Sequence, residues 1–384
     1  MISRERLLTA IAHREPDRVP LDLASTQVTG ISVIAYEKLR DYLHLPARTT
    51  AVCDAIQQIA LPGDDVLERF GVDTRGLWPL TSHNMPFEDI ESGEFLAHRD
   101  EWGLGYRRHR KGGLWYDLYA SPLDDPSLSG AEIRAFPWPD GGAQWRVAGL
   151  RERALSFRDA GYAVVLKSVC AGLLEMAIRL RGMEACLIDL LADKRRAGLI
   201  LDQVLKVKLE YWQTALNELG DVVDVVAEGD DFGTQQSALI SAAAFREMIK
   251  PRQAELIAFL RRGAPQAAVF FHSCGSVRTL MPDFIEMGID IINPVHITAA
   301  GMAPAELKRD FGKELVFWGG GIDTQGTLPN GSPQQVRDEV KRNIEAFAPG
   351  GGFVFNTVHN IQADVPPENI VAMYETLAES GSYR

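Results

Sequence analysis

The 384-residue sequence contains few cysteines, no long apolar run and no block of lysine and arginine. Its four cysteines follow no regular spacing, which excludes a disulfide framework and favours a reducing, cytoplasmic compartment. No stretch reaches the roughly 18 consecutive apolar residues of a membrane-spanning helix. The start of the chain also lacks the apolar segment of a signal peptide. We therefore expect a cytoplasmic protein that does not enter a membrane.

Positive charge is also scarce, because 40 Lys and Arg residues are set against 52 Asp and Glu residues, for a net charge of −12. Without a basic patch the chain has no electrostatic surface for nucleic acid or anionic lipid, although a local basic pocket for a small anion stays open. Hydrophobic residues make up 46% of the chain and charged residues 24%, which excludes a disordered chain. The expected ligand is a small molecule.

Short apolar, β-branched runs alternate with helical stretches along most of the chain. The helical stretches include 190–219 and 332–348, where Ser332 is placed to cap the second helix and Pro333 to begin it. Strands that are apolar throughout and separated by helices form a parallel sheet covered by helices. Seven or eight such units favour a closed barrel, so we predict the α/β class with a single (β/α)8 barrel domain over residues 1–384. The predicted strands are 18–24, 162–169, 222–229, 267–274, 289–295, 314–320 and 352–358.

Two segments depart from this repeat. The N-terminus predicts a short helix, ended by Pro16 and Pro20, as an N-terminal extension of the barrel. Residues 75–145 are rich in Trp, Gly, Pro and Asp and lack helical periodicity, which predicts short strands and loops laid over the barrel. This insertion is either a lid, with Trp102 and Trp115 closing over the site, or a surface insertion without a role.

The strand end HSCG contains the residues best suited to bind a metal. His272 and Cys274 are two residues apart in a strand, so their side chains point to the same face. Imidazole and thiolate together are half of a zinc site, and His359 closes a later strand as a third candidate ligand. The alternative is that His272 hydrogen-bonds a backbone group and Cys274 is a small buried side chain.

Three carboxylates, Glu228, Asp230 and Asp231, crowd the end of an earlier strand. Like charges this close raise the pKa of a buried carboxyl group, which suits a general acid or the binding of a cationic group. We therefore predict them as catalytic residues. The alternative for each of them is a solvated loop or the N-cap of the next helix.

Polar residues also follow two later strands. Asn293 and His296 lie at one strand end, and Asp323 and Gln325 follow the glycines 319–321, which let a backbone approach a ligand closely. We predict these four side chains as substrate contacts. The alternatives are a fourth metal ligand or an ordinary loop histidine for His296, and a tight turn for the glycines. The chain has no G-x-G-x-x-G, G-x-S-x-G or H-E-x-x-H motif to support a Rossmann, hydrolase or zincin function.

Together these segments resemble the uroporphyrinogen decarboxylase superfamily over nearly the whole chain. The resemblance implies a single (β/α)8 barrel, in agreement with the strand pattern. It is carried by RERLLTAIAHREPDRVPLD, DDFGTQ, FREMIKPRQAELI, FFHSCGSVRTLMPDFIEMGIDIINPV, LVFWGGGIDTQ and HNIQADVPPENIVAMYE.

The superfamily contains two chemistries, and the sequence discriminates between them. True uroporphyrinogen decarboxylases use no cofactor and bind porphyrinogen carboxylates through the arginines of an R-Q-A-G-R-Y motif. The corresponding stretch here is LASTQVTG, which has no arginine. Because eight carboxylates need cationic partners, this absence counts against porphyrinogen as the substrate.

The other branch comprises zinc-dependent methyltransferases that serve corrinoid proteins or tetrahydrofolate. Their zinc is held by an H-x-C-G strand end and by a cysteine before the C-terminal P-x-x-P-x-E-N-I-like segment. The resemblance assigns His272 and Cys274 to the first part, and His359 stands in place of the cysteine, as it does in the decarboxylases. No D-x-H-x-x-G corrinoid-binding motif is present, so a corrinoid would have to come on a separate protein.

The leading hypothesis is therefore zinc-dependent methyl transfer, either demethylation of a small methylated substrate or transfer between a corrinoid protein and a thiol or tetrahydrofolate. Zinc would act as a Lewis acid, and Glu228, Asp230 and Asp231 would orient the substrate or supply a proton. The alternatives are a cofactor-free decarboxylase of a porphyrinogen-like polycarboxylate and a non-catalytic barrel that binds a small ligand or a corrinoid protein. Apolar outer helix faces are compatible with a homodimer.

Overall fold

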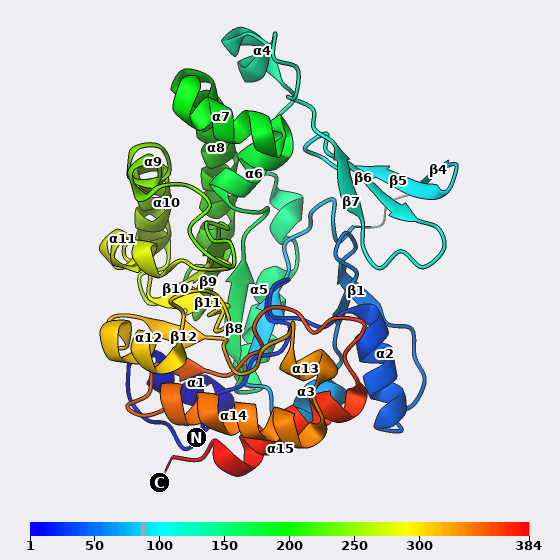
Figure 1. Cartoon of the computed structure of the whole chain (residues 1–384), viewed down its shortest axis with the longest axis vertical. Helices are drawn as coiled ribbons and strands as arrows, with labels where there is room; N and C mark the ends of the chain where they lie inside the picture. The colour runs from blue at the N-terminus through cyan, green and yellow to red at the C-terminus, as the bar shows by residue number, and fades with distance from the viewer. Residues whose placement is uncertain (86–88, 384) are drawn as a thin grey trace.

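The computed structural model describes residues 1–85 and 89–383 and contains a parallel sheet that curls into a barrel (Figure 1). All neighbouring strands in this sheet are parallel. Their order matches the order along the chain, as in a barrel built from successive βα units. The strands are β3 (Thr74–Leu77), β8 (Ala163–Lys167), β9 (Val225–Gly229), β10 (Ala268–His272), β11 (Ile291–Asn293), β12 (Val316–Trp318) and β13 (Phe353–Val354).

An eighth, very short stretch of chain closes the barrel between β13 and β3. The amide of Phe355 donates to the carbonyl oxygen of Pro20, and the amide of Asp22 donates to the carbonyl oxygen of Phe355. On the other side, the amide of Asp73 donates to the carbonyl oxygen of Leu21. The predicted (β/α)8 barrel is therefore confirmed, and the predicted extended run 18–24 supplies its closing strand.

The barrel strands are buried on both faces, which explains why they read as continuous apolar runs. In β8, Ala163 and Val165 belong to the cluster inside the barrel, whereas Val164 and Leu166 pack outward against the helices. Helix α1 (Ser3–Ile11) sends Leu7 into the interior cluster. This N-terminal helix therefore plugs the barrel at the amino ends of the strands and leaves the carboxyl ends open.

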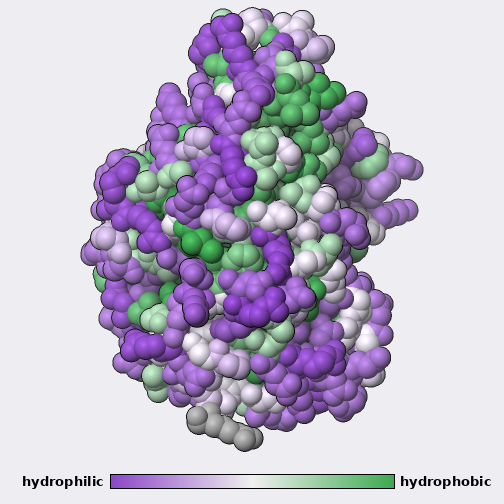
Figure 2. All heavy atoms as spheres, turned by 60° about the vertical axis from the view of Figure 1, so that its left-hand side comes forward, coloured by the Kyte–Doolittle hydropathy of each residue, from purple (hydrophilic) through white to green (hydrophobic). Residues whose placement is uncertain are grey.

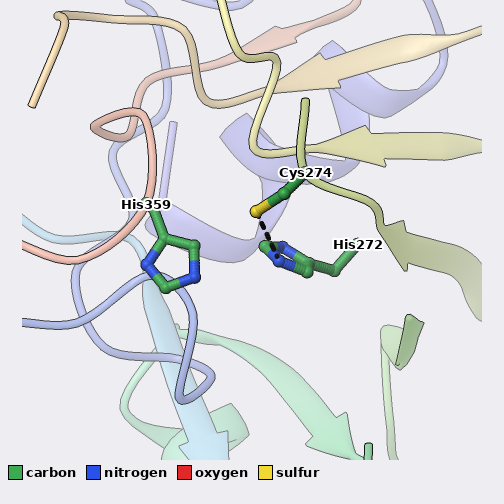
Figure 3. A group of neighbouring side chains, drawn as sticks. All are labelled: His272, Cys274 and His359. Atoms are coloured by element: carbon green, nitrogen blue, oxygen red, sulfur yellow. Dashed lines mark hydrogen bonds between the residues drawn. The ribbon is translucent and has the colours of Figure 1, made fainter. Parts of the chain in front are cut away.

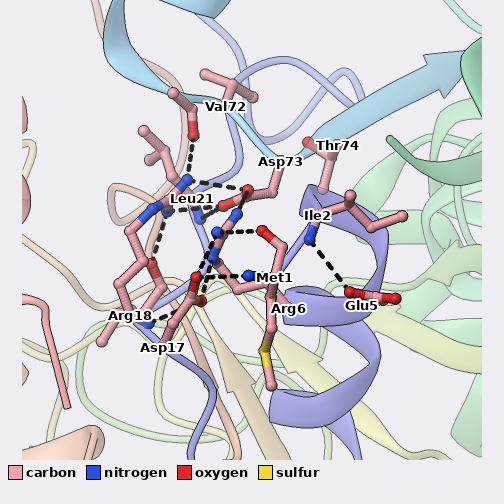
Figure 4. A network of polar contacts seen from close by, with 12 residues as sticks. Met1, Ile2, Glu5, Arg6, Asp17, Arg18, Leu21, Val72, Asp73 and Thr74 are labelled. Carbon is pink, nitrogen blue, oxygen red and sulfur yellow. Dashed lines mark hydrogen bonds and ion pairs between the residues drawn. The ribbon is translucent and has the colours of Figure 1, made fainter. Parts of the chain in front are cut away.

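A network of ion pairs holds α1 and the closing strand to β3 (Figure 4). The carboxylate of Asp73 is completely buried and accepts hydrogen bonds from Arg6 at 2.7 Å, from Arg18 at 2.8 Å and from the amide of Leu21 at 2.9 Å. Arg6 also pairs with Asp17 at 2.6 Å. The polar residues of the opening motif REPDRVPLD thus close the barrel.

Helices surround the sheet (Figure 1). Ser332 caps α14 by accepting the amide of Gln335, and Pro333 is the first residue of the helix, as predicted. The predicted single helix 190–219 is instead divided at Asp193, whose backbone is not helical and whose side chain caps the following helix. The other α-helices of four or more residues are α2 (Val33–Tyr42), α3 (Asp64–Phe70), α4 (Gly130–Ala135), α5 (Leu150–Asp159), α6 (Leu173–Arg181), α7 (Met183–Ala192), α8 (Lys194–Leu219), α10 (Lys250–Gly263), α11 (Met281–Met287), α12 (Pro304–Phe311), α13 (Thr327–Asn330), α14 (Pro333–Phe347) and α15 (Pro367–Ser380).

A separate antiparallel sheet stands beside the barrel, at the right of Figure 1. It lies within the segment 75–145, for which short strands and loops were predicted, although the first residues of that segment complete β3. The strands of this sheet are β4 (Ile90–Ser92), β5 (Phe95–Arg99), β6 (Gly105–His109) and β7 (Asp117–Ala120), and a hairpin of β1 (Ala51–Asp54) and β2 (Ile59–Leu61) precedes it.

The outer surface is mostly hydrophilic, with apolar side chains gathered in the upper part of the face shown in Figure 2. Helix α7 exposes Met183, Ile188 and Leu191 to solvent. Patches of this kind are typical of protein interfaces, and the homodimer stays a prediction. Among the residues that the structure describes, no helix combines the length and apolarity needed to cross a membrane.

Candidate metal centre and the adjoining cavity

The structure brings His272, Cys274 and His359 together at the carboxyl end of the barrel (Figure 3). His272 ends β10, Cys274 follows it by two residues, and His359 lies in the loop after β13. One potential ligand atom of each residue lies within 4.8 Å of those of the other two, and Sγ of Cys274 is 3.3 Å from Nε2 of His272. Two nitrogens and one sulfur in this arrangement match the three-ligand set of a catalytic zinc site.

Asn293 fixes the orientation of the His272 ring. Its Oδ1 lies 2.6 Å from Nδ1 of His272, while its amide nitrogen donates to the carbonyl oxygen of Trp318 at 2.8 Å. Because Oδ1 can only accept, Nδ1 carries the proton, and the unprotonated Nε2 faces the Cys274 sulfur at 3.3 Å. Asn293 was predicted as a substrate contact. That role stays a prediction, and the structure places the side chain completely buried behind His272, in the position of a supporting residue if His272 binds a metal.

Asp231 is the acidic residue closest to these ligands. Its Oδ1 accepts the backbone amide of Cys274 at 2.8 Å and lies 3.5 Å from Nε2 of His272. Burial, together with the negative charge of Asp231, raises the pKa of the Cys274 thiol well above its usual value. The sulfur therefore holds its proton until a cation arrives, which couples metal binding to proton release.

His359 has an unusual backbone and a neutral ring. Its φ of 71° lies in the left-handed region, and its Nδ1 accepts the amide of Asn360 at 2.8 Å. Burial and the neighbouring His272 lower the pKa of His359, so the ring is uncharged near neutral pH. With Nδ1 engaged as an acceptor, the proton of the neutral ring resides on Nε2. Binding a metal through Nε2 therefore requires the ring proton to move to Nδ1, which breaks the hydrogen bond from the amide of Asn360.

The other two predicted catalytic carboxylates have different roles in the structure. Asp230 is fully buried and accepts the amides of Leu174 and Glu175 at the start of α6, together with the side chain of Gln253. Burial raises the pKa of Asp230 to about 8. Its catalytic role stays a prediction, and the structure places the carboxylate at the start of α6, outside the lining of the cavity described below.

Glu228 borders that cavity as half of a buried ion pair. Its carboxylate accepts hydrogen bonds from Lys208 at 2.7 Å, Ser168 at 2.7 Å and Trp212 at 2.5 Å. Because three donors occupy its oxygens, the Glu228 carboxylate is not available to take a proton from a substrate or to give one. Of the three predicted catalytic carboxylates, Asp231 alone combines exposure to the cavity with proximity to the candidate ligands.

The remaining predicted substrate contacts form a polar cluster outside the lining of the cavity. Gln235 lies between His296, at 3.3 Å, and Gln325, to which it donates at 2.6 Å. Asp323 accepts the amide of Gln325 at the start of α13. In the glycine run 319–321, a Cβ at Gly319 would meet the carbonyl oxygen of Pro294 at 2.1 Å. These glycines therefore serve close backbone packing, while the predicted substrate contacts at this strand end stay predictions.

A cavity of about 420 Å³ lies beside the candidate ligands, between the barrel mouth and the antiparallel sheet. His272 and His359 line one part of it, and Trp102, from the insertion, lines another. Trp102 thus lies where the lid prediction placed it. Trp115, in contrast, is 48% exposed and does not line the cavity, so its predicted closure over the site is corrected.

Sequence reasoning missed two cations that line this cavity, Lys167 and Arg179. Lys167 ends β8, two residues after Val165, whose side chain faces the barrel interior. The alternation of a strand therefore predicts that Lys167 points into the barrel mouth, and the strand itself was identified. Arg179 lies on α6 and pairs with Glu175 at 3.2 Å, a helical contact that the sequence gives no reason to place in a cavity.

The lining of the cavity is acidic on balance. Arg179 has a carboxylate partner, and Lys167 is the second of only two Lys or Arg side chains in the described lining. This lining is not suited to a substrate that carries many carboxylates. The acidic residues are Asp54, Asp100, Glu101, Asp117, Glu175, Glu228 and Asp231.

The fold and this site define a (β/α)8-barrel protein with a candidate metal centre at the carboxyl ends of its strands. The family model "Uroporphyrinogen decarboxylase (URO-D)" matches residues 130–380, well over half of the sequence, and the chain belongs to this family. Metal-dependent and metal-free chemistry must therefore be distinguished at the site, because a fold does not determine a function.

Known proteins resemble the chain over parts of its length. Uroporphyrinogen decarboxylase of Aromatoleum aromaticum is 25% identical over 186 residues, which cover 46% of this chain and 48% of that enzyme. The enzyme of Serratia proteamaculans is 35% identical over 80 residues, or 22% of its length. The chain thus spans at most about half the length of these relatives. A methyltransferase from Methanosarcina mazei shares the fold over 99% of both chains, with a TM-score of 0.66 and 18% sequence identity.

Proposed function

We propose that this protein catalyses zinc-dependent methyl transfer. The observation that carries the proposal is the cluster of His272, Cys274 and His359, whose potential ligand atoms lie within 4.8 Å of one another beside a cavity. The donor set fits zinc, since His272 presents an unprotonated Nε2 and Cys274 presents its sulfur on the same side. Zinc bound there would act as a Lewis acid that lowers the pKa of a substrate thiol or polarises the heteroatom of a methyl donor.

The residues of the chain supply the surroundings of this chemistry. Asn293 holds the His272 ring in place, and Asp231 holds the backbone at Cys274 while its carboxylate stays partly exposed to the cavity. Asp231 is therefore the residue placed to accept or return a proton from a substrate. Trp102 and the antiparallel sheet shield the cavity from water on the side away from the barrel.

The acidic lining favours this function over the decarboxylation of a porphyrinogen-like polycarboxylate. The decarboxylase names of the relatives keep that reaction as the competing proposal, and it needs no metal. The methyl carrier would be a corrinoid on a separate protein or tetrahydrofolate. A non-catalytic binding protein is the third outcome that the same assay can reveal.

The test combines metal content with turnover. Purified protein is loaded with zinc, and methyl transfer from methylated small molecules to free corrinoid or to tetrahydrofolate is followed by mass spectrometry. We expect transfer that requires zinc and is lost in Cys274→Ala but kept in Cys186→Ala, since Cys186 is a buried thiol on α7 outside the site. Release of carbon dioxide from uroporphyrinogen by metal-free protein would instead establish the decarboxylase. If neither reaction occurred, the non-catalytic binding protein would be the outcome.

A further inference from the structure

Lys167 is a buried cation to which the described residues offer an aromatic ring but no anionic partner in contact. Its side chain is 8% exposed, and its ammonium faces the ring of Trp78 at 5.2 Å from the ring centre. Among the residues that the structure describes, no hydrogen-bond acceptor or carboxylate contacts this ammonium. The nearest acidic influence is Asp54, whose oxygens accept the backbone and side-chain amides of Gln57 instead.

A second buried lysine of the same barrel has hydrogen-bond partners for its ammonium, unlike Lys167. Lys208 is completely buried, and its ammonium donates to Glu228 at 2.7 Å and to Ser168 at 2.9 Å. Lys167 lies one residue from Ser168 and has neither contact. Because an unpaired buried charge is costly, the environment of Lys167 is incomplete in a way that the environment of Lys208 is not. Burial lowers the pKa of Lys167, and an anion beside it would restore that pKa.

The position of Lys167 relates it to the candidate metal centre. Lys167 ends β8 and His272 ends β10, and only β9 separates the two strands. The two strand ends are therefore about 10 Å apart, twice the spacing of neighbouring strands. Both side chains line the same cavity. A ligand that touched both would have a body about the size of one ring.

The other walls of the cavity indicate the chemical character of the ligand body between Lys167 and His272. Buried apolar and aromatic side chains line it, and a volume of about 420 Å³ is at the small end of the usual range for ligand pockets. Since Arg179 is paired with Glu175, Lys167 is the one unmatched cation of the described lining. One unmatched cation suits one negative charge. The larger buried aromatic and aliphatic lining residues are Ile56, Trp102, Leu104, Tyr106, Tyr116, Val169, Met176 and Phe270.

We propose that Lys167 binds the carboxylate of the substrate, and that the substrate is a small compound with one carboxylate, an apolar or aromatic body and a methyl group at the far end. Only the methyl group of this substrate rests on the proposed methyl transfer. The carboxylate, the body and their orientation follow from Lys167 and the walls of the cavity. The carboxylate lies at the β8 end of the cavity, and the methyl group lies toward His272 and Cys274.

Two probes of equal shape test the anion site. Benzoate and benzamide differ in charge and hardly in size, and their binding is measured by titration calorimetry with wild-type protein, Lys167→Met and the exposed-lysine control Lys206→Met. Each protein is measured both zinc-loaded and metal-free, because a carboxylate can also bind zinc directly. We expect metal-free wild type and Lys206→Met to prefer benzoate by about tenfold or more, as for a charge-assisted hydrogen bond. Lys167→Met should lose this preference while keeping its affinity for benzamide.

Each outcome separates the two proposals. A benzoate preference that survives Lys167→Met, or no benzoate binding to wild type at millimolar concentration, overturns the anion site whether or not zinc binds. A preference that depends on Lys167 in a protein that takes up no zinc supports the anion site and refutes the zinc chemistry. If Lys167→Met does not fold, the comparison of benzoate with benzamide in metal-free wild type decides, since equal affinities would contradict the proposal.

Discussion

The two ends of the barrel differ in how their charges are paired. At the amino end, Asp73 is buried among Arg6, Arg18 and the amide of Leu21, and every charge has a close partner (Figure 4). At the carboxyl end, the Cys274 thiol has a raised pKa and the Lys167 ammonium has no anion in contact among the described residues. Both ends carry ionisable groups.

This difference separates stability from function. In (β/α)8 barrels, residues at the amino ends of the strands serve stability, whereas residues at the carboxyl ends form the site. The paired network at the amino end contributes to folding without any ligand. At the carboxyl end Lys208 and Glu228 are paired in the same way, whereas a cation at the candidate ligands and an anion at Lys167 would add stability only on binding. Substitutions at the two ends should therefore have opposite consequences for folding and for binding.

The largest effect on folding is expected for Arg6→Met. Removing this guanidinium leaves the buried Asp73 with Arg18 as its sole charged partner, and breaking a buried pair costs about 3 kcal/mol. Denaturant unfolding measures the loss, with the exposed Lys206→Met as a control that should change stability by less than about 0.5 kcal/mol. An unchanged unfolding free energy in Arg6→Met would contradict the stabilising role of this end.

The opposite pattern is expected for the candidate ligands. His272→Ala and Cys274→Ala should each weaken zinc binding by more than about 100-fold, because loss of a supporting residue alone costs 10- to 100-fold. The stability of the metal-free protein should change by about 1 kcal/mol, since each substitution removes side-chain hydrogen bonds and not one half of a buried ion pair. Competition with a chromophoric chelator measures affinity, with Cys186→Ala as the control. Destabilisation as large as that of Arg6→Met would remove the distinction between the ends.

Asn293→Ala tests the support behind His272. The variant frees the Nδ1 proton and lets the ring turn, so zinc affinity should fall by about 10- to 100-fold while the metal ligands remain. The same chelator competition gives the value. If Asn293→Ala bound zinc as tightly as wild type but lost substrate affinity, the predicted role of Asn293 as a substrate contact would be supported instead.

Zinc affinity should rise with pH. The metal-free protein holds a proton on Cys274, whose pKa is raised by burial and by Asp231, and zinc binding releases that proton. Between about pH 7 and pH 8 the affinity should therefore increase by about tenfold, one proton being released per zinc bound. Chelator competition in buffers of constant ionic strength checks this slope. A flat profile would mean that the sulfur does not bind the metal.

The smallest effect concerns acid stability at the amino end. A hydrogen bond from Arg6 lowers the pKa of Asp17 below its unfolded value, so its contribution is present above about pH 4 and is lost as the pH falls. Because Asp17 is partly exposed, solvent screening limits this contribution to about 1 kcal/mol or less. Asp17→Asn should reduce the difference in unfolding free energy between pH 7 and pH 3. An identical pH dependence in variant and wild type would contradict it.

Much of this arrangement could be predicted from the sequence. Runs such as 162–169 and 267–274 are apolar throughout because both faces of a barrel strand are buried, and this pattern gave the barrel. The rule that sites lie at the carboxyl ends of strands then singled out His272, Cys274 and His359, which the structure brings together.

What could not be predicted depends on partners distant in the sequence. Asp230 and Asp231 are neighbours, yet one caps α6 and the other faces the cavity, because side chains of adjacent residues point in opposite directions. The break at Asp193 depends on its side chain capping α8, and the sequence on both sides of Asp193 has a helical pattern. Lys167 was within reach, since the alternation in β8 points it inward, but its lack of a partner is visible only in three dimensions.

X-ray absorption spectroscopy of the zinc-loaded protein tests the central claim most directly. We expect one zinc per chain, with one sulfur at about 2.3 Å and nitrogen neighbours at about 2.0 Å. Cys274→Ala should lose the sulfur scattering, whereas Cys186→Ala should keep it. A zinc surrounded by oxygen and nitrogen alone in wild type, or a wild-type protein that takes up no zinc, would contradict the metal centre at the carboxyl end of this barrel.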